Sequence, residues 1–158
     1  MTHANELPDS AQRPNTLAAV AQLARSHGNS CAAPAGDFYA WIREFLDSFY
    51  IEQDKHQRAA MLAHEPLELA EARENAYIAG VAEHLALRYE LPVPAWVHAP
   101  SRFLKRAFFP CGLESLKAML IAQSPAAFRR RMIFVELDPL YRPRRDVIGY
   151  TVEAYVPH

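Results

Sequence analysis

The residues whose chemistry stands out in this chain of 158 residues are arginines near its end. They form two groups, Arg129–Arg131 and, in a proline-bent loop, Arg142 with Arg144 and Arg145. A guanidinium group stays charged, and its planar fork of N–H donors matches a carboxylate or a phosphate. Such groups bind an anionic partner, but they supply no nucleophile and no general base. The pattern therefore predicts a binding surface rather than a reaction centre.

Two phenylalanines flank the first group of arginines. Phe128 lies directly before it, and Phe134 lies in the apolar run that follows. Three consecutive residues on a helix spread over about 200° of arc, so they cannot all face one flat surface. We therefore expect Phe128 to pack inward and one arginine to lie along the domain. The predicted partner-binding residues are Phe128, Arg129, Arg130, Arg131, Phe134, Arg142, Arg144 and Arg145.

Charge is divided unevenly along the chain, although the formal net charge is only −1. Residues 1–90 hold 7 basic and 13 acidic residues, a net charge of −6. Residues 91–158 hold 10 basic and 5 acidic residues, a net charge of +5. This division has two explanations, which the sequence leaves open. Either the basic half binds an acidic partner, or it pairs with the acidic half inside the same domain.

Signatures of catalysis and of metal binding are missing from the sequence. The 7 histidines form no HExxH and no repeated Glu-x-x-His, and there is no G-x-S-x-G or glycine-rich phosphate loop. We therefore predict no metal, no cofactor and no catalytic residue.

Cys31 and Cys111 stand far apart and are expected to be reduced thiols. Without an apolar run of about 18 residues or a secretory signal, the predicted location is the cytoplasm, with no membrane partner.

The hydrophobic pattern predicts a mainly α-helical protein, and 51% of its residues are hydrophobic, enough to build a core. Residues 1–36 are expected to be a flexible tail with a short helix at 16–27, capped by Thr16. A single compact helical domain then covers residues 37–158. Large apolar side chains recur at helical spacing over residues 38–49 and predict the first core helix of this domain.

The next elements follow from local start and stop signals. A helix over Gln57–His64 is followed by a helix with Pro66 at its first position, which should end near Tyr89, before Pro92. Trp96, in the stiff connector beyond that proline, is expected to fill the core where the connector crosses it. This part of the domain is thus predicted to be an assembly of helices.

The last part of the chain mixes helix and strand signals. Short helices are predicted over 101–109 and 113–122, and a third over Ser124–Arg131, with the serine as its cap and a proline at its first position. The β-rich segments 132–135 and 147–156 are predicted to pair as a small C-terminal hairpin. The expected fold class is therefore mainly α, with this hairpin at the end.

The chain resembles a family of small bacterial proteins at three segments, Ala82–Tyr89, Leu91–Val97 and Ser124–Val135. The shared pattern is AEHLALR…LPVPAWV…SPAAFRRRxIFV, and the resemblance spans roughly residues 38–137. Some resembling proteins carry an N-terminal helix-turn-helix of the repressor type. Some are encoded beside nucleotidyltransferase-like proteins, which implies toxin–antitoxin pairs. The first 36 residues here are too poorly patterned for the repressor-type domain, so the resemblance implies no operator binding by this chain.

On these grounds the protein is predicted to be a non-catalytic, antitoxin-like or regulatory subunit. Its basic C-terminal surface would bind and occlude an acidic protein, and the resemblance implies a nucleotidyltransferase-like toxin as that partner. The alternative is a nucleic-acid-binding regulator that uses the same arginines. A helix-turn-helix over 113–131 would have a second helix of only about seven residues, which is short for a recognition helix. An enzyme without recognisable motifs is the third hypothesis.

Overall fold

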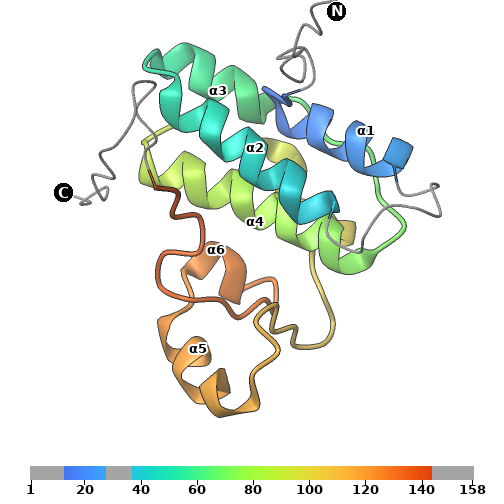
Figure 1. Ribbon diagram of the computed structural model, residues 1–158, viewed down its shortest axis with the longest axis vertical. Helices are drawn as coiled ribbons and strands as arrows, with labels where there is room; N and C mark the ends of the chain where they lie inside the picture. The colour runs from blue at the N-terminus through green and yellow to red at the C-terminus, as the bar shows by residue number, and fades with distance from the viewer. Residues whose placement is uncertain (1–12, 28–36, 144–158) are drawn as a thin grey trace, which may run out of the picture.

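The computed structural model describes residues 13–27 and 37–143 (Figure 1). Within these ranges the chain is mainly helical, as the sequence predicts. The α-helices are α1 (Leu17–His27), α2 (Asp37–Ile51), α3 (Lys55–Ala63), α4 (Ala72–Arg88), α5 (Lys117–Gln123) and α6 (Ala126–Arg129). Short 3₁₀ turns lie between α4 and α5, at Ala95–His98, Pro100–Arg102 and Glu114–Leu116.

The central element is α4. Its side chains are buried on nearly every face between Asn75 and Ala86, as expected for a helix enclosed by other elements. In Figure 1, α2 and α3 lie above it and α6 lies below it. A Cβ atom at Gly80 would come within 2.9 Å of the Phe128 ring, so glycine is what allows α6 to approach this closely.

The aromatic face predicted over residues 38–49 is the buried face of α2. Phe38, Phe45 and Phe49 pack in one apolar core with α1 and α4. The predicted helix at 16–27 and its cap are confirmed, since the Thr16 hydroxyl oxygen accepts the Ala19 N–H at 3.0 Å. However, α1 packs against α2 in the same core, so the domain includes this helix and does not begin at residue 37.

The chain between α3 and α4 is extended. Pro66 does not begin a helix there, and α4 starts later, at Ala72. Asn75 holds the extended segment, because its side chain accepts the Leu69 N–H and donates to the Leu69 carbonyl, both at 2.8 Å. Such local side-chain bonds offer the backbone an alternative to helix, and here they prevail over the proline signal.

Residues 101–109 do not form the predicted helix. After a 3₁₀ turn the chain is irregular, and Phe108 makes an isolated parallel bridge to Ile133. The predicted strand 132–135 therefore pairs with this segment through that isolated bridge. The other arm of the predicted hairpin, 147–156, lies outside the described residues.

Ser124 does not cap α6, because Pro125 is the residue that precedes the helix. The Ser124 hydroxyl instead donates to the Leu120 carbonyl at 2.6 Å and accepts the Val135 N–H at 2.8 Å. It thereby ties the end of α5 to the extended chain that follows α6. As a result, α6 is a single turn and is shorter than predicted.

Candidate partner-binding surface

Arg131 is fully buried, with 0% of its side chain exposed, so the prediction that it faces outward is wrong. Its guanidinium donates to the carboxylate of Glu83 on α4, to the Ala127 carbonyl at 2.7 Å and to the Val97 carbonyl at 2.8 Å. Burial lowers the pKa of Arg131, and the hydrogen bond that Arg131 donates to Glu83 opposes that shift. A buried charge has to be paired and hydrogen-bonded, and this site meets both needs.

Arg130 pairs with the same carboxylate from the solvent side. Its Nη2 lies 2.8 Å from the second oxygen of Glu83 and 3.3 Å from Nδ1 of His98. Its side chain is 45% exposed, whereas that of Glu83 is buried. Two arginines therefore flank one carboxylate, and the surplus positive charge reaches the surface through Arg130.

Arg142 is also paired inside the molecule. Its Nε and Nη2 both donate to the Asp47 carboxylate on α2 at 2.9 Å, a bidentate contact. These bonds raise the pKa of Arg142 above its ordinary value. Arg144 and Arg145 lie outside the described residues. Of the two explanations for the uneven charge, internal pairing thus holds for Arg131, for Arg142 and in part for Arg130.

The two phenylalanines that flank the arginines, Phe128 and Phe134, pack inside the protein. Phe128 is buried, as predicted, with its ring 5.4 Å from that of Tyr77 and 5.8 Å from that of His84. Phe134 is buried and stacks on Phe109 at 5.1 Å. Both side chains support the surface from beneath and are not available to a partner.

Arg129 is exposed and makes no ion pair with the residues that the structure describes. The segment beside α6 carries two more exposed cations, Lys105 and Arg106, which likewise make no ion pair with the residues that the structure describes. Hydrogen bonds from the Leu104 N–H to the Arg131 carbonyl and from the Phe108 N–H to the Met132 carbonyl bring the two segments together. We name the resulting patch the basic edge; it consists of Lys105, Arg106, Arg129 and Arg130.

The sequence shows Lys105 and Arg106 as a basic pair, but it predicts a different position for them. Lys105 and Arg106 fall in the segment predicted as a helix, where Arg102 and Arg106 would share a face. The structure separates them, since Arg102 is buried and Arg106 is exposed. Only the pairing of residues 104–108 with 131–134, which no local pattern encodes, brings Lys105 and Arg106 to the basic edge.

An apolar surface lies on α5 and on the loop before it. Leu113, Met119 and Ile121 are 54%, 43% and 47% exposed, whereas Leu120 between them is buried. In Figure 1, α5 lies at the opposite end of the molecule from α1 and α3. We name these three exposed residues the α5 apolar face. Met119 and Ile121 lie about 200° apart around the helix axis, on the two sides of the buried Leu120.

The described residues contain no group of three or more histidine, cysteine, aspartate or glutamate side chains that would hold a metal ion. Cys111 is a free, exposed thiol. Within the described ranges, no helix has both the length and the apolar character that crossing a bilayer requires. The surface with the clearest chemical character is therefore the basic edge together with the α5 apolar face.

Comparisons with protein-family models, with curated proteins and with solved structures gave no match to this chain.

Proposed function

We propose that this protein is a non-catalytic binding subunit that docks on an acidic protein through the basic edge and the α5 apolar face. One observation supports this most strongly. Arg131 and Arg142 are used inside the molecule, yet Lys105, Arg106 and Arg129 remain exposed and unpaired among the described residues. Cations that the fold does not use are free to steer and orient a partner of opposite charge.

The α5 apolar face gives this surface the second element of a protein interface. Stable interfaces combine apolar residues at the centre with a charged rim, and the apolar residues supply most of the binding energy. Met119 fits the central role, and Arg129 fits the rim. In this proposal the partner is an acidic protein, and the bound subunit occludes part of that protein's surface.

The antitoxin-like role and the nucleotidyltransferase-like partner come from the resemblance described above. A neutralising subunit needs a complementary surface and no catalytic group, which agrees with the chemistry of the basic edge. The protein would act in the cytoplasm beside such a partner. Nucleic acid binding through the same cations is the competing function, and four cations would give it a measurable salt dependence.

The test is co-purification of the full chain from its native host, followed by affinity measurements on the partner that is recovered. We expect an acidic protein whose association rate falls about tenfold when Lys105→Glu and Arg129→Glu are combined. Met119→Asp should accelerate its dissociation. Matched controls are Arg25→Glu, an exposed arginine on α1, and Ile51→Asp, an exposed apolar residue at the end of α2.

Two results would contradict the proposal. The first is a partner whose affinity responds equally to the control variants, because its interface would then lie elsewhere. The second is tight binding of random duplex DNA or single-stranded RNA that weakens steeply with salt and is lost in the Lys105→Glu, Arg129→Glu variant. That second result would favour the nucleic-acid function.

A further inference from the structure

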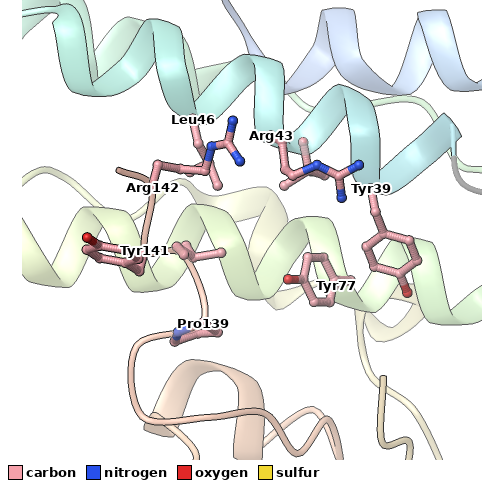
Figure 2. Close-up of a pocket in the computed structure, with 9 residues that line it drawn as sticks. Tyr39, Arg43, Leu46, Tyr77, Pro139, Tyr141 and Arg142 are labelled. Atoms are coloured by element: carbon pink, nitrogen blue, oxygen red, sulfur yellow. The ribbon is translucent and has the colours of Figure 1, made fainter. Parts of the chain in front are cut away.

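A shallow depression lies between α2, α4 and the segment 139–142. Its volume is about 160 Å³. Figure 2 shows Arg43 and Tyr39 of α2 at one end, Tyr141 and Arg142 at the other, and Tyr77 of α4 on the floor between them. Polar and apolar side chains both line it.

The first observation concerns Tyr77. Tyr77 as a whole is only 8% exposed. In Figure 2 its hydroxyl points into the depression. A tyrosine at the edge of the core can keep its ring packed while its hydroxyl offers a ligand a hydrogen bond. Edge-on contacts at 5.2 Å with Tyr39 and 6.1 Å with Phe38 fix the ring.

The second observation concerns the arginines of the depression. Arg43 is exposed and makes no ion pair with the described part of the chain. Its charge lies close enough to Tyr77 to influence the pKa of that hydroxyl. Arg142 uses Nε and Nη2 on Asp47, and its Nη1 makes no hydrogen bond with the residues that the structure describes. Donors from three side chains thus line one depression.

Nearby carboxylates limit the charge of the ligand. Burial is the largest cause that raises the pKa of Tyr77 and of Tyr39, and a carboxylate adds to it in each case, Glu136 at Tyr77 and Glu74 at Tyr39. Tyr77 is therefore protonated and can donate a hydrogen bond. The same carboxylates repel a dianion more strongly than a monoanion, so they favour a singly charged ligand. The apolar walls formed by Ile42, Leu46 and Leu140 suit an organic substituent.

We propose that this depression binds a small organic carboxylate between the Arg43 guanidinium and the Tyr77 hydroxyl. The substituent of the anion lies against the side chains of Ile42 and Leu140. This site is separate from the proposed partner-binding surface and does not depend on that function. A bound ligand would bridge α2, α4 and the segment 139–142.

The experiment is an NMR titration of the full chain with benzoate, phenyl phosphate, inorganic phosphate and, as a neutral control, benzyl alcohol. We expect saturable shifts near Tyr77 with benzoate, with a Kd of about 1 mM or tighter. Phenyl phosphate should bind more weakly than benzoate, because it carries nearly two negative charges at neutral pH. Inorganic phosphate should bind more weakly, because it lacks the apolar group.

Variants make the assignment specific. Arg43→Gln should weaken binding about tenfold, because it removes a charged hydrogen bond, and Tyr77→Phe should weaken it while keeping the ring in place. Arg25→Gln, which changes an exposed arginine on α1, should leave the affinity unchanged. Absence of saturable binding, equal binding of benzyl alcohol, or an unchanged affinity in Arg43→Gln would each overturn the proposal.

Discussion

Apolar side chains hold the helices α1–α4 together, whereas the irregular segment 95–140 relies in large part on buried arginines. In the helical part, Phe45, Phe49 and Ile78 are fully buried against their neighbours. In the irregular segment, the two largest fully buried side chains are Arg102 and Arg131. The two regions share α4, so one helix serves both kinds of packing.

The chemistry of Arg102 explains this difference. Its Nη2 donates to the Pro66 carbonyl at 2.5 Å, and its guanidinium lies 5.2 Å from the centre of the Trp96 ring. Loops leave backbone carbonyls without helical partners, and one guanidinium has five donors to satisfy several of them. A segment with little regular structure is fixed to α4 by the same group, since Nη1 of Arg102 donates to Oδ1 of Asn75 at 3.4 Å. Basic residues can therefore stabilise the fold, and only those that the fold does not use remain available to bind a partner.

The largest expected effect comes from breaking the charge pair on α4. Glu83→Gln leaves Arg131 buried without its counter-charge, so the free energy of unfolding should fall by about 3–5 kcal/mol in urea titrations. Glu114→Gln is the matched control, because Glu114 forms an exposed pair with Lys117. That control should change stability by less than about 0.5 kcal/mol. Equal effects of the two variants would show that the buried pair is not what holds the segment.

The contact between the two regions is tested next, at Gly80. A methyl group there would meet the Phe128 ring at 2.9 Å, so Gly80→Ala should destabilise the protein by about 1–3 kcal/mol through overpacking. Combining it with Phe128→Leu should recover part of that loss, because the smaller side chain makes room. A double variant whose destabilisation equals the sum of the two single effects would argue against this contact.

A smaller effect is expected from His84, whose Nε2 is buried without a hydrogen-bond partner in the described ranges. Burial, helped by Arg88 and opposed by Asp138, lowers the pKa of His84 below its ordinary 6.5. Below pH 6.5 the unfolded chain therefore binds more protons than the folded one, and the free energy of unfolding falls as the pH is lowered through that value. Urea titrations at several pH values should show this slope reduced in His84→Gln and retained in His56→Gln.

The smallest effect is expected at Arg142. Its pair with Asp47 is partly exposed, so Arg142→Gln should cost only about 0.5–1 kcal/mol, far less than Glu83→Gln. High salt should weaken the wild-type pair more than it weakens the buried contacts of Arg131. Thermal unfolding at low and high salt would check this. If Arg142→Gln lowered the free energy of unfolding as much as Glu83→Gln does, the distinction between exposed and buried ion pairs would be contradicted.

The helical fold could be predicted from the sequence because its signals are local. The aromatic spacing over 38–49, the Thr16 cap and the core position of Trp96 all depend on neighbouring residues or on hydrophobicity, and each is confirmed. Trp96 donates its ring N–H to the Leu62 carbonyl at 3.0 Å, as a buried indole should.

The roles of the arginines could not be predicted in the same way. Arg129 and Arg131 differ only in which side of a single turn they occupy, and the partner of Arg131 is Glu83, far away in the sequence. The helix signal at Pro66 failed for a related reason, since the Asn75 side chain satisfies the backbone of the preceding loop. Charge alone indicated where arginines gather, but long-range pairing decides which of them are free.

The most direct test compares these neighbouring arginines in one measurement, the free energy of unfolding of Arg131→Gln and of Arg129→Gln in urea. The account predicts a loss of about 3–5 kcal/mol for the buried Arg131 and less than about 0.5 kcal/mol for the exposed Arg129. Similar values for the two variants would contradict the division between an arginine that holds the fold and one that is left for a partner.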